Sequence, residues 1–454
     1  MVSVLRRLFV VTVSLVAICL APGPAHGQEA AAPVEDDAVL QALIAEALAR
    51  NPDLHAAQSA ISAAQTSTES ARALPDPMVS VTYTNDGWAP TLGSMPMTTL
   101  GFMVSQALPY SGKRDLRAAL AASQARQFEP ALARARLALE GAVRRAYYGL
   151  LLARELQTLT DEQRKLLQQI EVVVRARYAV GQGAQTDVLR VQTEVTRIEQ
   201  RAIEQAAEAD VRLAEINRLL GRPLDTPVTT AARLALAPLA VSPEEAFDEA
   251  RAVSPELQGA ALAIETSTAA AALARRDLKP DFSLQAGYMN RGGLDAMWLA
   301  GVGITLPFNR KARESAVAEA EIRAKGGSHV VESMELQLAY KTRERFTRAK
   351  ALEKLVALYD GGIIPQDQMT VESSLTNYQT GKVPFVSVLE AMTSLYADRW
   401  ARAGLLADHA RLRASLREAS LEAGPEMSQA SAPSAGNMSS GQAAGGMSGG
   451  MGGK

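Results

Sequence analysis

The chain has 454 residues, 47% of them hydrophobic and only 5% aromatic, and 47 Lys and Arg residues nearly balance 49 Asp and Glu residues to give a net charge of −2. This length allows more than one ordinary domain, and the Ala- and Leu-rich composition favours helix. The chain lacks the strong positive excess of a nucleic-acid-binding domain, so nucleic acid is not an expected partner.

The first residues have the pattern of a signal peptide. Arg6 and Arg7 precede an apolar run over 8–21, and small residues follow in "PAHG", which predicts a signal peptide over 1–27. The single cysteine, Cys19, lies in the apolar run, and the bulky Ile18 before it argues against a lipid anchor. No later segment has the long uncharged run of a membrane helix. We therefore expect a periplasmic or secreted protein, or one held in the outer membrane by β-strands.

An internal repeat organises the rest of the chain. "RYAVGQGAQTDVL" at 177–189 is matched by "NYQTGKVPFVSVL" at 377–389, and "EALARNPDL" at 46–54 is matched by "EARAVSPEL" at 249–257. Such self-similarity indicates a duplicated structural unit. The sequence therefore predicts a first repeat over 28–220, an inter-repeat linker over 221–243, a second repeat over 244–422 and a flexible Gly/Ser/Met-rich tail over 423–454.

Each repeat contains two short segments in which apolar residues alternate with small or polar ones. They lie at about 78–84 and 99–108 in the first repeat, and at about 282–289 and 297–306 in the second. An apolar and a polar face over about ten residues is typical of a membrane β-barrel strand, although a soluble hairpin with one buried face gives the same pattern. Aromatic residues near the strand ends fit either membrane-interface or packing positions: Trp88, Trp298, Tyr110 and Phe308.

Long helical segments follow the strands. From Ser111 to about Tyr178 the composition favours one helix, which we expect Pro130 to kink. In the second repeat, Gly326-Gly327 is expected to weaken the helix at the matching place. Heptad spacing of apolar residues predicts antiparallel coiled-coil hairpins, with tips at about 179–186 and 379–386.

Four membrane strands do not close a barrel, and unpaired strand edges are not tolerated in lipid. The smallest closed bacterial barrels have about eight strands, so the chain must assemble through its strands. Three copies would give twelve strands and a matching tube of twelve helices. These helices are too polar to cross the membrane and must project into the periplasm.

The whole pattern resembles the TolC-type outer-membrane efflux proteins over about residues 36–422. The resemblance rests on the helix starts "NPDL" and "SPEL", the strand ends "QALPYSGKR" and "TLPFNRKAR", and the paired tips. It implies a mainly α fold with a small membrane β part, forming a homotrimer with a 12-stranded β-barrel in outer-membrane lipid and a 12-helix periplasmic α-barrel. A substrate would pass through it passively, delivered by an inner-membrane pump and a periplasmic adaptor protein. We expect no enzymatic activity and no cofactor.

The resemblance also implies roles for residues at the tips. Acidic residues after each turn would form a periplasmic gate in the family, here Asp187 and Glu390, with Arg190 weakening the acidic ring or pairing with Glu390. Helix capping is an equal alternative for Asp187. Residues of the two turns would dock the adaptor, although turn chemistry alone also explains them: Gly181, Gln182, Gly183, Gly381, Lys382 and Pro384.

Methionines raise the possibility of a soft-metal cargo. Thioethers suit Cu(I) and Ag(I), and "ALPYSGKRDLRAAL" looks like the heavy-metal branch of the family. The candidates lie in one inter-strand loop and in the tail, where incidental methionines are the alternative: Met95, Met97, Met438, Met447 and Met451.

Three other functions remain compatible with the sequence. A periplasmic coiled-coil adaptor is also exported and also carries hairpins, but it normally has one hairpin flanked by β-rich domains. In an exported helical scaffold, the strands would only be hairpins appended to the helices. A channel for type I protein secretion shares the predicted architecture, and the sequence does not separate it from an efflux channel.

Overall fold

The computed structural model describes residues 38–92, 95–231, 233–419 and 421. The predicted signal peptide and the tail methionines Met438, Met447 and Met451 lie outside these residues. The first half contains α1 (Ala38–Arg50), α2 (Pro52–Arg72), β1 (Met78–Thr84), β2 (Thr99–Leu108), α3 (Lys113–Arg126), α4 (Phe128–Ala179) and α5 (Gln185–Leu219). The second half contains α6 (Pro243–Val253), α7 (Pro255–Arg276), β3 (Asp281–Arg291), β4 (Leu294–Thr305), α8 (Arg310–Leu358), the π-helix η1 (Tyr359–Ile363), α9 (Ile364–Gln379) and α10 (Phe385–Arg417).

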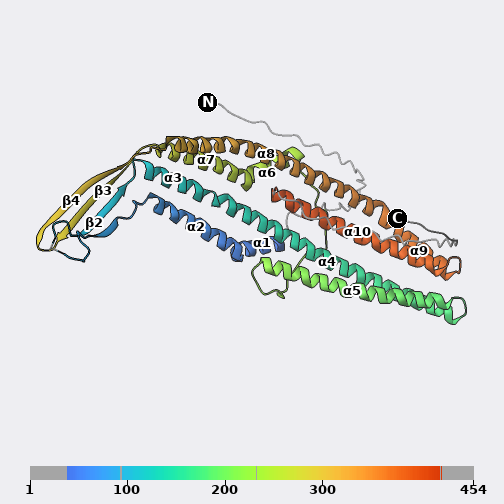
Figure 1. Cartoon of the computed structure of the whole chain (residues 1–454). Coiled ribbons are helices and arrows are strands. Elements are labelled where there is room, and N and C mark those ends of the chain that lie inside the picture. Colours follow the sequence, from blue (N-terminus) through green and yellow to red (C-terminus); the bar gives the residue numbers. More distant parts are fainter. Residues whose placement is uncertain (1–37, 93–94, 232, 420, 422–454) are drawn as a thin grey trace, which may run out of the picture.

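The molecule is elongated, with the sheet at one end and two helical hairpins at the other (Figure 1). The hairpin α4–α5 belongs to the first half, and the hairpin α9–α10 belongs to the second. Both tips lie at the end far from the sheet because the two halves run the same course (Figure 1). Among the described residues, no helix combines the length and the apolar character needed to cross a bilayer.

The four strands form one antiparallel sheet in the order β1-β2-β3-β4. The two halves meet between β2 and β3, where Phe102 is opposite Tyr288. β3 and β4 are longer than the sequence predicted, because only Gly292 and Gly293 separate them. Gly292 has a φ of 66°, which suits glycine and closes a tight turn between the two strands.

The two faces of the sheet differ in chemistry and in exposure. One face carries aliphatic and aromatic side chains that no other described part of the chain covers, including Val79 at 67%, Val302 at 68% and Trp298 at 81% exposure. The other face carries mostly Ser, Thr, Gly and Gln, and its central residues are half-buried. A four-stranded sheet that leaves its apolar face open needs an apolar environment beyond the chain itself.

The sequence predicted two interruptions of the long helices, and the structure has the one beside Pro130 but not the one at Gly326-Gly327. Gln127 separates α3 from α4, three residues before Pro130, which lacks the N–H that would bond to the carbonyl of Arg126. By contrast, α8 runs unbroken through Gly326 and Gly327, so the predicted weak point there was wrong. Glycine keeps its backbone N–H, and its cost of about 1 kcal/mol in a helix is small beside that of proline.

Gly327 has a packing role that explains its place in α8. A Cβ atom on this residue would lie 2.7 Å from Cγ1 of Ile264 on α7. The glycine therefore lets α7 and α8 approach closely beside the sheet. The irregularity in this half of the chain lies further on, at η1, directly before Pro365.

The duplicated "NPDL" and "SPEL" motifs are helix starts. The Asn51 side chain accepts a hydrogen bond from the Asp53 N–H at 2.9 Å and caps α2, with Pro52 at the first helical position. Ser254 caps α7 in the same way, accepting from the Leu257 N–H at 3.4 Å. Both caps satisfy backbone donors at helix ends, which is why the motif recurs in both halves.

A buried lysine joins the sheet to the helices. The ammonium group of Lys113, at the start of α3, donates to Asp281 Oδ2 at the start of β3 at 3.0 Å. It also donates to the Lys279 carbonyl at 3.0 Å. Because Lys113 is only 1% exposed, these partners stabilise a charge that would otherwise be strongly unfavourable. The strand of one half is thereby fixed to the helix of the other.

Candidate functional site at the hairpin tips

The turns of the two hairpins share one backbone geometry. Gly181 and Gly381 have φ values of 72° and 76°, and each donates its N–H to the carbonyl of the tyrosine three residues earlier at 3.0 Å. The next residues, Gln182 and Lys382, each donate to a carbonyl five residues earlier at 2.9 Å. This pattern ends a helix with glycine in the left-handed conformation. Turn chemistry therefore accounts for both glycines.

The two hairpins pack together through an apolar cluster near their tips. We call it the tip cluster: Leu167, Ile170, Val174, Val191, Ile198, Val371, Tyr378, Phe385, Val388, Ala391, Met392, Leu395 and Tyr396. Its members come from α4, α5, α9 and α10, so it ties the duplicated halves to each other. The predicted hairpins are therefore not independent rods but one four-helix unit at this end of the molecule.

Tyr378 lies at the centre of the contact between the tips, whereas its duplicate Tyr178 is on the surface. Tyr378 is 3% exposed and Tyr178 is 47% exposed. The Arg177 guanidinium lies over the Tyr378 ring, 4.5 Å from its centroid, and donates to the Gln182 carbonyl at 3.0 Å. The Tyr378 hydroxyl donates to Asp187 Oδ2 at 3.5 Å. Burial, followed by the nearby Asp187 carboxylate, raises the pKa of Tyr378 and keeps its hydroxyl protonated as a donor.

The three predicted gate residues, two on α5 after the first tip and one on α10 after the second, differ in their surroundings. Asp187 is half-buried and contacts the second hairpin through Tyr378. Its carboxylate does not cap α5, because the N-cap is Ala184, which makes no side-chain cap hydrogen bond. Arg190 and Glu390 are both exposed, and no ion pair joins them within the described part of this chain. The expected Arg190–Glu390 pair is thus not present inside one protomer.

The residues predicted to dock an adaptor are accessible. Five of the six are exposed, and the sixth, Gly183, is half-buried. A Cβ atom on Gly183 would lie 3.2 Å from the Tyr178 nitrogen. The second turn has Val383 at this position, and its side chain packs against the tip cluster. The two turns therefore present different surfaces although their backbones match.

Sequence reasoning missed the roles of Arg177 and Tyr378. The tyrosine was visible as a duplicated position, but the repeat made Tyr178 and Tyr378 look equivalent. Only the packing of one hairpin on the other shows which tyrosine is buried. Arg177 has Asn377 as its duplicate, and this difference between the repeats was the available signal.

A pair of carboxyl groups joins α9 to α10 further along the second hairpin. Asp398 lies within hydrogen-bonding reach of Asp367, whose buried Oδ2 has no donor from another described side chain. Burial, then the neighbouring Asp367 carboxyl group, raises the pKa of Asp398 to about 6. Nearby cations are engaged elsewhere, since Arg402 pairs with Asp360 of η1 and Arg399 pairs with Glu162 at 3.2 Å.

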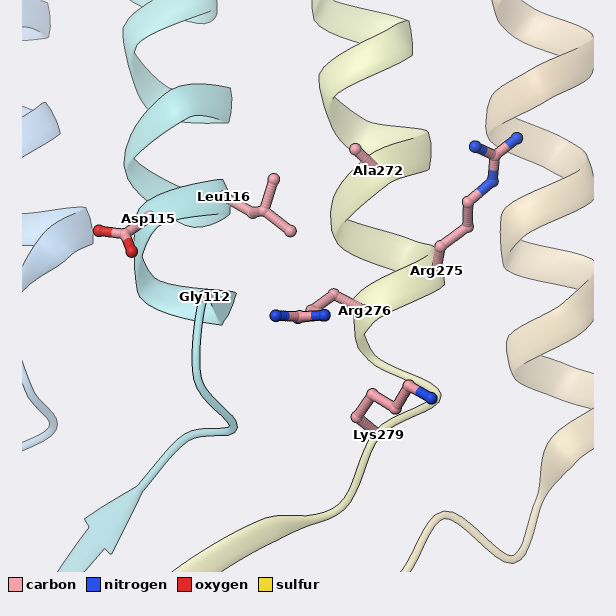
Figure 2. Close-up of a pocket in the computed structure, with 7 residues that line it drawn as sticks. All are labelled: Gly112, Asp115, Leu116, Ala272, Arg275, Arg276 and Lys279. Carbon is pink, nitrogen blue, oxygen red and sulfur yellow. The ribbon is translucent and has the colours of Figure 1, made fainter.

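A positively charged groove of about 510 Å³ lies where the sheet meets the helices, between α3 and α7. Figure 2 shows Arg276 extending towards Gly112 at the start of α3, while Arg275 points to the opposite side of α7. Arg276 donates to the Ser111 carbonyl at 3.0 Å and lies over the Tyr110 ring. Gly112 has a φ of 83°, and a Cβ atom there would lie 2.9 Å from Arg276. Cationic side chains, Arg275, Arg276 and Lys279, therefore line the groove at the helix-side end of the sheet.

The loop methionines Met95 and Met97 are both exposed, in the connection between β1 and β2. Among the residues that the structure describes, no group of three or more His, Cys, Asp or Glu side chains could hold a metal ion.

Comparison with known proteins decides the family. The model of the outer membrane efflux protein family matches residues 43–222 and 246–420, which correspond to the two repeats. The chain belongs to the outer membrane efflux protein family. A search by sequence among curated proteins finds no match.

Solved structures with the same fold include other outer-membrane channels. OprN, described as an outer-membrane channel, is 18% identical with a TM-score of 0.71, over 85% of this chain and 90% of that chain. CusC is 19% identical with a TM-score of 0.68, over 85% and 91%. VceC, an outer membrane protein of Vibrio cholerae, is 20% identical with a TM-score of 0.69, over 86% and 97%.

Family membership settles three expectations from the sequence. This efflux protein is an outer-membrane channel component with its helices in the periplasm, and it is not an enzyme. The resemblance to TolC-type proteins is confirmed by the match over both repeats.

We predict that Tyr378→Ala loosens the contact between the tips, whereas Tyr178→Ala does not. Removing a buried aromatic side chain costs about 3–5 kcal/mol, and the exposed duplicate has little to lose. Hydrogen exchange of the purified protein in detergent measures local opening of residues 371–392. The amides there should exchange at least about tenfold faster in Tyr378→Ala. Equal exchange in both variants would contradict the central role of Tyr378.

The Asp367–Asp398 pair should make the second hairpin more stable at lower pH. The pKa of Asp398 is raised above its ordinary value, so the folded state binds the proton more tightly, and this stability is lost as pH rises through about 6. Asp398→Asn keeps a neutral donor to Asp367. Its Tm should therefore exceed that of the wild type at pH 7.5, and the difference should shrink between pH 6 and 4 and disappear below about 3.8, where Asp398 is protonated in both the folded and the unfolded state. Asp210→Asn, at an exposed site on α5, is the control and should show no such trend.

Proposed function

We propose that this protein is the trimeric outer-membrane tunnel of a tripartite efflux system. Three copies would place twelve strands in one closed β-barrel and their helices in one periplasmic tube. The observation that carries this proposal is the four-stranded sheet. Within the described residues its apolar face is uncovered, and its outer strands β1 and β4 each have one free edge. Lipid accepts such a sheet only when every edge is paired, which further copies of the same sheet would achieve.

The proposed cargo is a heavy-metal cation such as Cu(I) or Ag(I), delivered by an inner-membrane pump through a periplasmic adaptor. Passage through the tunnel would be passive, since the chain has no nucleotide-binding motif. The exposed turns at Gln182, Lys382 and Pro384 support docking of the adaptor at the end remote from the sheet. The duplicated hairpins would give six tips around the periplasmic mouth of a trimer.

The assembly is tested by the mass of the purified protein in mild detergent and by its conductance in planar bilayers. We expect a trimer from the outer-membrane fraction and discrete K⁺-conducting channels. A monomer recovered from the periplasmic fluid, without conductance, would instead support a soluble adaptor or scaffold. Export of a protein rather than a metal by the intact system would indicate a type I secretion channel.

We further propose that, in the trimer, Asp187 forms one acidic ring at the periplasmic mouth and Glu390 forms another. Arg190, one turn beyond Asp187 on α5, would weaken the negative charge of the first ring. Closely spaced carboxylates attract cations and repel one another. The double variant Asp187→Ala with Glu390→Ala should lower the cation preference of the channel or change its resting conductance. The matched control replaces two exposed acids outside the tips, Asp210 and Glu372, by Ala. Indistinguishable currents in the two double variants would remove the gate assignment.

A further inference from the structure

Each of the four strands carries one methionine, and all four methionines lie on the same face of the sheet. They are Met78 on β1, Met103 on β2, Met289 on β3 and Met297 on β4. The strand register places them there, because side chains alternate between faces and directly opposite residues share a face. Met289 is opposite both Met297 and Gly101, and Met103 is opposite both Gly287 and Ser80.

The four methionines follow a continuous diagonal across the sheet. Met289 and Met297 are directly opposite, a placement in which Cβ atoms lie about 5 Å apart. Met103 is displaced by two residues from the level of Met289, and Met78 is displaced by two residues from the level of Met103. Such diagonal neighbours lie about 7–8 Å apart, within reach of long flexible side chains.

Two glycines leave space for these side chains. A Cβ atom on Gly101 would lie 3.7 Å from Cγ of Met289, so the methionine side chain extends over this glycine. A Cβ atom on Gly287 would lie 3.7 Å from Cβ of Met103. The diagonal therefore passes two positions that carry no side chain, Gly101 and Gly287.

Ordinary apolar packing does not explain this arrangement. Val, Ile, Phe and nearly all Leu side chains of the strands lie on the opposite face, and only Leu299 joins the methionines. The methionine face is otherwise formed by Ser, Thr, Gly, Gln and Ala, with Asp at the strand ends. Met78 and Met297 are 64% and 50% exposed, so their sulfur-bearing side chains are not core residues. An apolar residue placed four times on the polar face is better explained by the chemistry of its sulfur.

We propose that Met78, Met103, Met289 and Met297 form a thioether track that carries Cu(I) or Ag(I) along the inner wall of the barrel. This inference rests on the proposed function, in which the polar face lines the pore. Soft monovalent ions prefer thioethers to the hydroxyl and amide groups around them. A series of weak neighbouring sites lets an ion enter and leave, which a single tight site would prevent.

The loop methionines of the sequence analysis lie near one end of this track. Arg291, two residues beyond Met289, donates to the Pro96 carbonyl at 2.8 Å. This hydrogen bond holds the loop segment containing Met95 and Met97 against the end of β3. The loop would extend the track at the end of the sheet furthest from the helices.

The test uses the full-length protein in detergent, with Ag(I) as a redox-stable probe in chloride-free buffer. All samples carry Leu at tail positions Met427, Met438, Met447 and Met451, so that the tail contributes no thioether. The track variant adds Met78→Leu, Met103→Leu, Met289→Leu and Met297→Leu, which conserve volume. The control variant instead adds Met334→Leu and Met369→Leu, on helices α8 and α9.

We expect the track variant to lose about one bound Ag(I) per chain relative to the control, because the neighbouring thioethers would hold a soft ion together. Silver X-ray absorption should show sulfur neighbours in the control and their loss in the track variant. Equal Ag(I) stoichiometry in the two variants would overturn the track. K⁺ conductance separates the proposed tunnel from the proposed track. If the control variant does not conduct K⁺, the tunnel proposal is wrong. If both variants conduct K⁺ but bind Ag(I) equally, only the track proposal is wrong.

Discussion

The structure depends on one constraint: the four-stranded sheet cannot by itself bury its apolar face or pair the hydrogen-bonding groups of its two edge strands. In the part of the chain that the structure describes, nothing covers its apolar face, and β1 and β4 each present one unpaired edge. In water this sheet would aggregate, and in lipid its free N–H and C=O groups would be strongly unfavourable. Closure with copies of itself satisfies both demands, and the polar face then becomes the inner wall of a pore. Outer-membrane location follows from family membership, and the proposed trimer follows from this constraint.

Duplication fixes the distance between the sheet and the tips, while divergence gives the two tips different surfaces. The backbones of the two turns match down to the hydrogen bonds of Gly181 and Gly381. Yet Tyr378 is buried where Tyr178 is exposed, because the hairpins pack on each other asymmetrically. Asp187 and Arg190 of the first repeat also correspond to Ser387 and Glu390 of the second repeat. A ring of tips would therefore alternate between two kinds of surface, which suits a partner that contacts both.

Much of the architecture was predictable because it depends on local patterns. Alternation located β1 and β2, and the caps at Asn51 and Ser254 explain the repeated helix starts. Long-range packing set the rest. The need for glycine at position 327 of α8 depends on the close approach of Ile264 on α7, and the length of the β3–β4 hairpin depends on the turn at Gly292. The diagonal of strand methionines could not be predicted without the register, because a shift by one residue moves a side chain to the other face.

The most direct measurement compares the surroundings of the two faces of the sheet. Single cysteines replace Val104 and Ser105, neighbours on β2 that point to opposite faces, in a Cys19→Ser background, and each carries a nitroxide label in the protein reconstituted into liposomes. Collisions with oxygen report lipid, and collisions with a water-soluble nickel chelate report water. The account predicts that the label at position 104 favours oxygen and the label at position 105 favours the chelate. Equal access of the chelate to both labels would contradict a lipid-facing sheet and the tunnel built on it.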